Sequence, residues 1–204
     1  MPTLPRPLVL ASTSHYRRDL LERLRLPFEV IAPEVEETPR PGEDPARLAL
    51  RLALAKAQAV AARRPDALVI GSDQVADLDG TPIGKPLTHG RAVEQLRAMS
   101  GRRIVFQTAV AVVCGASGFE QVLLASVQVR FRALSDDEIA RYLLAEQPYD
   151  CAGSARSEAL GIALLESIDS DDPTALIGLP LIRTCALLRA AGLDPLGAAG
   201  PAPA

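Results

Sequence analysis

Leu8-Val-Leu-Ala-Ser-Thr-Ser-His-Tyr-Arg-Arg-Asp-Leu-Leu-Glu-Arg-Leu24 is the segment from which the fold of this chain can be inferred. Residues 8–10 form an apolar run long enough for a buried strand, and leucines recur at helical spacing over residues 20–24. The hydroxyls of Ser12-Thr-Ser14 can cap a helix, because they accept hydrogen bonds from free N–H groups of a first turn. The segment therefore predicts a strand, a tight polar loop and a helix.

Arg17 and Arg18 fall in the first turn of this predicted helix. Cations at that end oppose the helix dipole, so helix stability does not explain them, whereas an anionic ligand such as a phosphate does. The alternative is two solvated arginines on a surface helix. The three hydroxyls at the strand exit favour the phosphate site.

Composition limits the class of protein. With 204 residues, 48% of them hydrophobic and 23% charged, the chain suits one domain, of one or two lobes, with a sizeable core. The formal net charge of −3 argues against a general nucleic-acid binder, so a phosphate site has to be a local basic cleft. Residues 197–204 are rich in Gly, Pro and Ala and are expected to be a disordered tail.

The cysteines and histidines indicate the compartment. Cys114, Cys151 and Cys185 are odd in number and lack metal-ligand spacing, which suggests a reducing environment. Two histidines, His15 and His89, disfavour a histidine-based metal site. The start has no long apolar stretch typical of a signal peptide, and no run reaches transmembrane length. We expect a soluble cytoplasmic protein with no membrane partner.

Pro33-Glu-Val-Glu-Glu-Thr-Pro39 is bracketed by prolines and should be an extended loop. Glu34, Glu36 and Glu37 lie close together in it. A carboxylate beside a phosphate site is the usual way to hold Mg²⁺, which prefers oxygen ligands. The alternative is a solvated loop.

Two lysines are candidates for phosphate contacts. Residues 45–64 form an Ala- and Leu-rich segment without internal Gly or Pro, which predicts a helix. Lys56 lies at the border of its apolar stripe, where it could reach a phosphate or simply extend to water. Lys85 is held between Gly84 and Pro86, which suits a fixed contact but is weak support alone.

Residues 67–70 predict a buried strand, which ends in Gly71-Ser-Asp-Gln74. α/β proteins place chemistry just past the carboxyl end of a strand. Asp73 could hold a metal or accept a proton there, or it could be a turn residue. Asp77 and Asp79 fit a hairpin turn better than a metal site.

The rest of the chain predicts an α/β pattern. Residues 103–114 and 121–131 should form an antiparallel hairpin, and residues 149–165 a loop over a pocket. We also expect strands at 28–32 and 164–168, and helices at 88–99, 135–145 and 181–191. A capping box opens the helix at residue 135.

Together, several motifs resemble the Maf family of nucleoside-triphosphate pyrophosphatases: Ala11-Ser-Thr-Ser with Arg17-Arg18, Pro33 to Pro39, Gly71-Ser-Asp-Gln74, Gly84-Lys-Pro86 and Gly178-Leu-Pro180. The likeness runs in order over roughly residues 8–196. It implies a single domain over residues 1–196 with an α/β fold, in which two lobes surround a deep cleft and helices flank a mixed, extended sheet. That fold is similar to the inosine-triphosphate pyrophosphatases.

Gly71-Ser-Asp-Gln74, Tyr149-Asp-Cys-Ala-Gly-Ser154 and Asp172-Pro-Thr-Ala-Leu176 resemble the subgroup acting on 7-methyl-GTP. The sister subgroup, acting on dTTP and UTP, carries Asp-Thr in place of Asp73-Gln74. The resemblance implies cleavage between the α- and β-phosphates, giving a monophosphate and pyrophosphate, with a divalent cation, Mg²⁺ or Mn²⁺.

The resemblance also implies residue roles by motif position. Asp73 is the general base, and Glu37 with Asp73 holds the metal. The other matched positions bind the substrate. Four contact its phosphates: Ser12, Arg17, Lys56 and Lys85. Three select the base: Tyr16, Gln74 and Glu158.

A physical argument supports the base selection. N7-methylguanine carries a positive ring charge, so Tyr16 could stack on it by cation–π attraction while Glu158 accepts its N1–H and amino hydrogens. The alternative is a packed tyrosine and a surface glutamate. The chain departs from the family at His15, usually Pro, and at Arg156 and Ala159, usually Lys and Gly in this subgroup. If the backbone at residue 159 has a positive φ, Ala159 would clash.

Three other functions are alternatives to nucleotide hydrolysis of this kind. The P-loop motif Gly-x-x-x-x-Gly-Lys-Ser/Thr does not occur, which disfavours a kinase or P-loop ATPase. A phosphomonoesterase uses similar acids and cations, and a non-enzymatic regulator of septum formation is the alternative from another class. The sequence allows a homodimer but gives no interface.

Overall fold

The first segment folds largely as predicted in the computed structural model, which describes residues 5–198. β1 (Leu8–Ala11) is buried throughout, and α1 (His15–Glu22) begins after a short loop. The predicted hydroxyl cap takes another form. Ser14 is the N-cap residue, but its side chain makes no capping bond to the described residues. Its N–H donates instead to Ser12 Oγ at 3.1 Å, which closes the loop.

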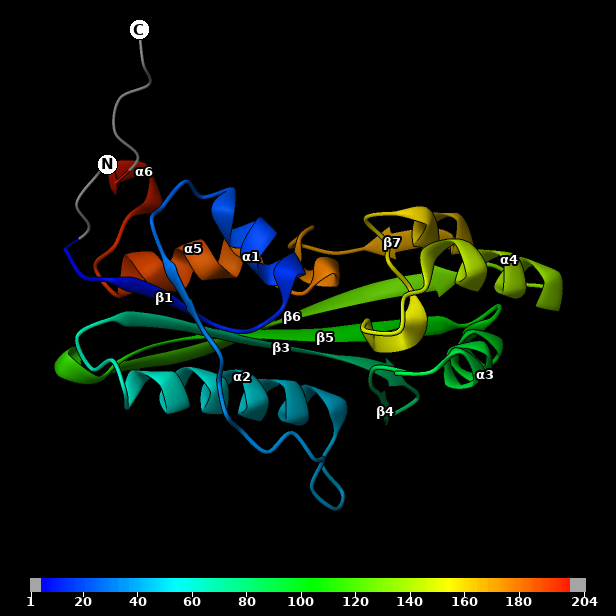
Figure 1. Ribbon diagram of the computed structural model, residues 1–204, viewed down its shortest axis with the longest axis horizontal. Coiled ribbons are helices and arrows are strands. Elements are labelled where there is room, and N and C mark those ends of the chain that lie inside the picture. The colour runs from blue at the N-terminus through cyan, green and yellow to red at the C-terminus, as the bar shows by residue number, and fades with distance from the viewer. Residues whose placement is uncertain (1–4, 199–204) are drawn as a thin grey trace, which may run out of the picture.

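A seven-stranded mixed sheet forms the centre of the protein, in the order β2-β1-β3-β5-β6-β7, with β4 paired to β3 (Figure 1). β1 runs parallel to β2 and β3, and the other pairs are antiparallel. This confirms the predicted mixed sheet. The other strands are β2 (Glu29–Ile31), β3 (Leu68–Leu78), β4 (Thr81–Ile83), β5 (Arg103–Cys114), β6 (Phe119–Phe131) and β7 (Leu165–Asp169).

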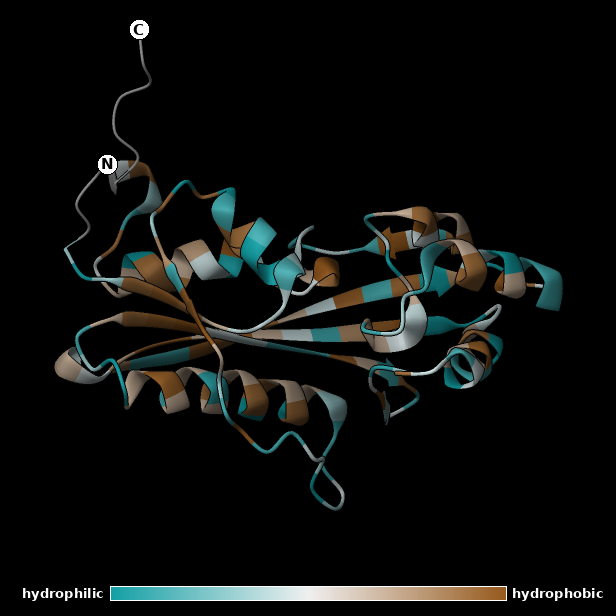
Figure 2. Ribbon diagram, viewed as in Figure 1, coloured by the Kyte–Doolittle hydropathy of each residue, from teal (hydrophilic) through white to brown (hydrophobic). Residues whose placement is uncertain are grey.

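Helices cover both faces of one end of the sheet. Successive side chains of a strand point to opposite faces, so Val9 and Ala11 pack against α2 (Pro45–Ala61) while Leu8 and Leu10 pack with α1 and α5 (Leu181–Ala190). Figure 2 shows the strands between these layers in the brown of apolar residues.

A separate core lies at the other end of the sheet. There Phe106, Val127 and Phe131 pack with α3 (His89–Met99) and α4 (Asp136–Glu146). The two groups of helices lie at opposite ends of the long strands β5 and β6 (Figure 1). The helices therefore form two groups joined by one continuous sheet, in agreement with the predicted fold class.

One predicted boundary is wrong in a way that matters for the site. The strand expected to end at residue 70 continues to Leu78, so Gly71-Ser-Asp-Gln74 lies inside β3 rather than in a loop after it. The reason is that β5 pairs with β3 as far as Asp77, whereas β1 pairs with it only as far as Gly71. The polar residues of β3 begin where its parallel neighbour stops.

The remaining elements lie close to their predicted ranges. The capping box of Ser135 and Glu138 is present, and Gly80 N–H donates to Asp77 Oδ1 at 2.7 Å in the predicted turn. β6 starts two residues earlier than predicted, at Phe119 rather than residue 121. The predicted loop 149–165 contains two 3₁₀ turns, η2 (Ala152–Ser154) and η3 (Leu160–Leu164). Two further 3₁₀ turns of the described chain are η1 (Gly115–Ser117) and η4 (Ala175–Ile177).

The C-terminal end is described only as far as Ala198. Gly197 and Ala198 close a short helix, α6 (Pro195–Ala198), and the rest of the predicted tail, residues 199–204, lies outside the described residues. Within residues 5–198, every helix is too short or too polar to cross a membrane.

Gly71 allows α2 to lie directly on β3. A Cβ built on Gly71 would lie 2.3 Å from the Ala53 carbonyl oxygen and 2.6 Å from the Ala57 backbone nitrogen. Both contacts are with backbone atoms, which cannot rotate away as a side chain does. Gly71 is therefore required by the close helix–strand approach next to Asp73.

We predict that Gly71→Ala lowers the free energy of unfolding by about 1–3 kcal/mol, because overpacking displaces α2. Gly90→Ala is the control, since a Cβ there meets nothing within 4 Å. Urea unfolding of both variants measures the difference. Equal stability of the two would contradict the assigned contact.

Candidate active site

Alternating residues of β3 send polar groups to both faces of the sheet. Asp73 faces α2 and Ser72 and Gln74 face the opposite side, as their partners show. Ser72 is fully buried and Asp73 is 7% exposed. Polar side chains in such a strand have to be paired, because an unpaired buried group is costly.

Lys56 joins two carboxylates. Its Nζ lies 2.6 Å from Asp73 Oδ1 and 2.7 Å from Glu37 Oε1. Lys56 is only 5% exposed, so the alternative of a lysine extending to water is excluded. The loop before α2, the helix itself and β3 thus meet at one ammonium group.

Two more predicted cations act on the same carboxylates. Burial raises the pKa of Glu37, but the Lys56 hydrogen bond and the positive charges of Lys56, Lys85 and Arg17 outweigh it and lower that pKa below its usual value. Burial lowers the pKa of Arg17, while the charges of Asp73 and Glu37 oppose the shift. Three cations against two carboxylates leave one positive charge in excess, which suits a polyanion.

Arg17 connects the first motif to the last. Its Nε donates to the Gly178 carbonyl oxygen at 2.8 Å, and its Nη1 lies 3.5 Å from Ser12 Oγ. Ser72 Oγ donates to the same Gly178 oxygen at 2.9 Å. The segment containing Gly178 is therefore fixed to both β3 and α1.

Gln74 holds the neighbouring backbone. Its Nε2 lies 2.9 Å from the carbonyl oxygens of Ala175 and Leu176 and 3.0 Å from Thr108 Oγ1, which itself donates to Ala175 O. Asp172 is fully buried, and its Oδ1 lies 3.1 Å from Thr174 Oγ1. The amide nitrogen of Gln74 therefore binds the wall of the site.

Tyr16 and Glu158, expected to select the base, are connected by Arg156. The guanidinium carbon lies 5.0 Å from the Tyr16 ring centroid, and Arg156 Nε lies 3.8 Å from Glu158 Oε1. His15 packs on Tyr16 with ring centroids 3.8 Å apart. Burial, with the Cys151 hydrogen bond, raises the pKa of Tyr16, so its hydroxyl stays protonated.

The third departure from the family pattern is not strained. Ala159 has φ −136° and ψ −145°, so the backbone there does not need glycine. Both remaining departures, His15 and Arg156, contact Tyr16.

Some residues of the site were not predicted from the sequence. Thr108 is a buried polar residue in the apolar strand β5, and that contrast is the signal that could have identified it. Arg51 and Glu43 form a two-pronged ion pair, with Nε–Oε1 of 2.6 Å and Nη2–Oε2 of 2.7 Å. Hydrogen bonds from Arg51 and from the Arg40 N–H lower the pKa of Glu43 to about 2, so the pair stays charged near neutral pH. Nothing in their spacing distinguished this pair from surface charges.

Glu37 and Asp73 suit a divalent cation. Both already converge on one positive group, and Mg²⁺ is commonly held by one or two carboxylates together with phosphate oxygens. Within residues 5–198 no cluster of three or more His, Cys, Asp or Glu side chains could hold a metal alone. A cation here would therefore take its remaining ligands from water and, with nucleotide present, from phosphate oxygens.

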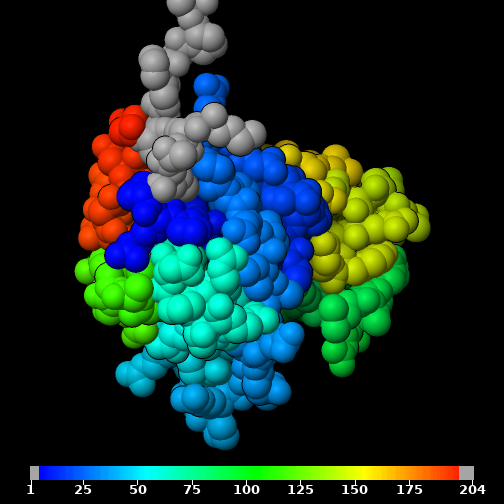
Figure 3. All heavy atoms as spheres, turned by 60° about the vertical axis from the view of Figure 1, so that its left-hand side comes forward, coloured from blue at the N-terminus to red at the C-terminus, as the bar shows by residue number. Residues whose placement is uncertain are grey.

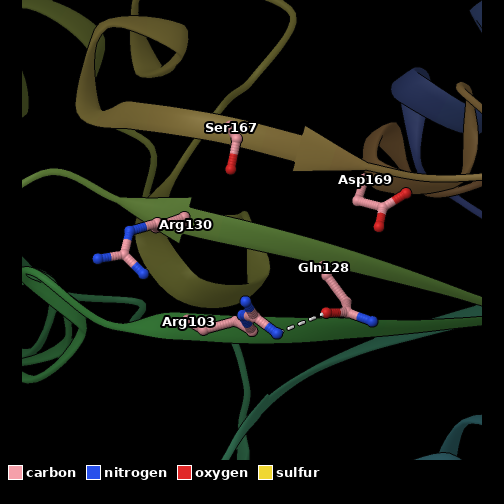
Figure 4. A pocket seen from close by; sticks show the side chains of 5 residues that line it. All are labelled: Arg103, Gln128, Arg130, Ser167 and Asp169. Carbon is pink, nitrogen blue, oxygen red and sulfur yellow. Dashed lines mark hydrogen bonds between the residues drawn. The ribbon is translucent and has the colours of Figure 1, made fainter.

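A pocket of about 140 Å³ lies elsewhere, on the sheet near β7 (Figure 4). None of its lining residues is a predicted site residue: Arg103, Gln128, Arg130, Ser167 and Asp169.

Comparisons with known proteins place the chain in a family. The family model described as Maf-like protein matches residues 7–191. A 7-methyl-GTP pyrophosphatase of Polaromonas sp. (strain JS666) is 72% identical over 92% of this chain and 86% of its own, and one of Albidiferax ferrireducens is 64% identical over 96% and 98%. A solved HAM1 protein from Coxiella burnetii is 17% identical, with a TM-score of 0.48, over 88% of this chain and 98% of its own. By the family match and these identities, the chain belongs to the Maf family.

Proposed function

We propose that this protein hydrolyses 7-methyl-GTP between its α- and β-phosphates, giving 7-methyl-GMP and pyrophosphate. The observation that carries the proposal is the convergence of Asp73, Lys56 and Glu37, with the charge of Arg17 acting on both carboxylates and that of Lys85 on Glu37. Relatives at 72% and 64% identity bear the name of this activity. Water adds to the α-phosphorus in the reaction, and the bond to the pyrophosphate oxygen breaks.

The cations bind and orient the triphosphate. Arg17, Lys56 and Lys85 offset its negative charge, and the buried Ser12 hydroxyl lies beside Arg17. Fixed positive groups in a site shielded from water stabilise developing charge without reorganisation. Arg17 is preorganised in this sense, because the Gly178 carbonyl already fixes its guanidinium.

Asp73 is the general base. Oδ1 contacts Lys56, so Oδ2 can accept a proton from the attacking water. Glu37 and Asp73 would hold Mg²⁺ or Mn²⁺, and such a cation, when bound, neutralises charge on the departing pyrophosphate. Lys56 Nζ, 2.6 Å from Oδ1, fixes the orientation of the Asp73 carboxylate within a largely buried site.

Tyr16 and Glu158 select the base. The positive ring of N7-methylguanine gains cation–π attraction from Tyr16, and Glu158 accepts hydrogen bonds from the N1–H and amino groups. Arg156 contacts both side chains, so the base and the guanidinium compete for the same partners. Gln74 contributes by fixing the backbone at residues 175–176.

The three free cysteines suit a reducing cytoplasm. A homodimer stays a prediction, tested by the mass of the protein in solution.

We predict that Asp73→Asn lowers kcat by at least ~10²-fold, the lower range for loss of a general base. Steady-state pyrophosphate release measures it, and thermal unfolding checks that the variant is folded. Turnover near the wild-type value in folded protein would eliminate Asp73 as the base.

A nucleotide panel distinguishes the reactions. With 7-methyl-GTP, GTP, dTTP and UTP, each with Mg²⁺ and with Mn²⁺, we expect the highest kcat/KM for 7-methyl-GTP and pyrophosphate as the product. Release of orthophosphate indicates a phosphomonoesterase, and preference for dTTP or UTP indicates the sister specificity. If none of the nucleotides is cleaved, the non-enzymatic role in septum formation is favoured.

Tyr16→Leu should reduce the preference for 7-methyl-GTP over GTP by about 2- to 30-fold, which corresponds to ~0.5–2 kcal/mol of cation–π attraction. Tyr16→Phe is the matched control, because it keeps the ring. The ratio of kcat/KM values for the two nucleotides is the measurement. An unchanged ratio in Tyr16→Leu would show that the Tyr16 ring does not recognise the positive charge of the methylated base.

A further inference from the structure

The segment between β2 and α2 carries Glu37 but contains no helix or strand of its own. It leaves the layer of α1 and crosses the sheet to the layer of α2 (Figure 1), and Figure 3 shows this blue segment lying over the surface beside α2 in cyan. Glu37 is 57% exposed, so packing alone does not fix its side chain.

Basic side chains of α2 and of the turn that follows it contact this segment at three places along its length. Arg63 Nη2 donates to the Ala32 carbonyl at 2.8 Å, and Lys56 contacts Glu37 at 2.7 Å. Arg51 makes the third tie, to Glu43 and, through Nη2, to the Thr38 carbonyl oxygen at 3.2 Å. Thr38 directly follows Glu37 in the chain.

The Arg51–Glu43 pair fixes the orientation of both side chains. Both guanidinium prongs engage the carboxylate, at 2.6 and 2.7 Å, and the side chains are only 21% and 9% exposed. Glu43 Oε2 also accepts the Arg40 N–H at 3.0 Å. Two-pronged Arg–carboxylate pairs fix orientation as well as distance. Arg51 therefore holds the segment at residues 38, 40 and 43 together.

Lys56 contacts Glu37 Oε1, an oxygen of the kind that a divalent cation binds, so Lys56 alone does not hold Glu37 once a cation takes that place. We propose that the Arg51–Glu43 ion pair is a positioning device that holds Glu37 as a metal ligand when a cation replaces Lys56 at this carboxylate. This inference rests on the proposed function and adds two residues that touch neither substrate nor metal.

The test uses the full-length protein and Mn²⁺ as the probe. Arg51→Met and Glu43→Gln remove the ion pair. Arg51→Lys keeps the positive charge but cannot make both hydrogen bonds of the guanidinium. Arg47→Met is the matched control, because Arg47 lies one turn earlier on α2 in an exposed pair with Asp44, 83% and 51% exposed. Electron paramagnetic resonance titration gives the Mn²⁺ affinity without any nucleotide, and thermal unfolding gives the folded fraction.

We expect about 10-fold weaker Mn²⁺ binding in Arg51→Met and Glu43→Gln, the low end of the range for residues that orient a metal ligand. Arg51→Lys should fall between them and the wild type, and Arg47→Met should match the wild type. With 7-methyl-GTP, the Mg²⁺ concentration for half-maximal rate should rise by the same factor, while kcat at saturating Mg²⁺ largely recovers.

A double-mutant cycle with Glu37→Gln separates positioning from simple bracing of the loop. If Arg51 acts through Glu37, then adding Arg51→Met to Glu37→Gln causes little further loss of Mn²⁺ affinity. Independent, additive losses overturn the proposal, as does a wild type that binds no Mn²⁺. Should Arg51→Met fail to fold, Arg51→Lys and Glu43→Gln carry the cycle.

The outcomes distinguish this inference from the proposed function. A wild type that binds Mn²⁺ but cleaves none of the nucleotides contradicts the function, while the Mn²⁺ affinities still decide the role of Arg51 as a positioning residue for Glu37. A wild type that cleaves 7-methyl-GTP, with unchanged Mn²⁺ affinity in Arg51→Met and Glu43→Gln, contradicts the positioning role alone.

Discussion

The Lys56 ammonium, buried between Asp73 at 2.6 Å and Glu37 at 2.7 Å, is the contact on which the arrangement of the site depends. Removing one partner of such a buried group leaves an uncompensated charge, which is far more costly than losing a surface pair. The helix, strand and loop that supply these three side chains are therefore held to one relative position. The charge balance that stabilises the fold is the same one that suits a triphosphate.

The sheet explains why the site lies where it does. β1 pairs with β3 only as far as Gly71, while β5 continues along β3 to Asp77. Past Gly71, β3 has no parallel neighbour in the described sheet, so polar residues can replace apolar ones there. Backbone carbonyls near Gly178 then fill part of this space and bind Ser72 and Gln74. The two apolar ends of the strands frame a polar middle.

Local sequence patterns predicted which helices and strands form better than the residues at which they begin and end. The capping box of Ser135 and the apolar face of α2 follow from neighbours in sequence, and both formed as expected. The predicted strand end at residue 70 is wrong because the apolar run stops there while β3 continues, and Gly71 inside it is needed for the approach of Ala53 and Ala57. The motif matches grouped Asp73, Lys56, Glu37 and Arg17. They did not show that Gln74 would bind the backbone, because its partners lie about a hundred residues away along the chain.

The sequence by itself determined the strand–loop–helix start, the α/β class and the residue types of the site, because these follow from hydrophobic period, turn chemistry and motif order. Only the tertiary structure decided which charges pair: Lys56 with both carboxylates, Arg51 with Glu43, and Arg156 with the face of Tyr16. Charge pairing depends on distances of a few ångströms between distant segments. No periodicity along one segment encodes those distances, and the packing of distant segments on one another, such as α2 on β3, sets them.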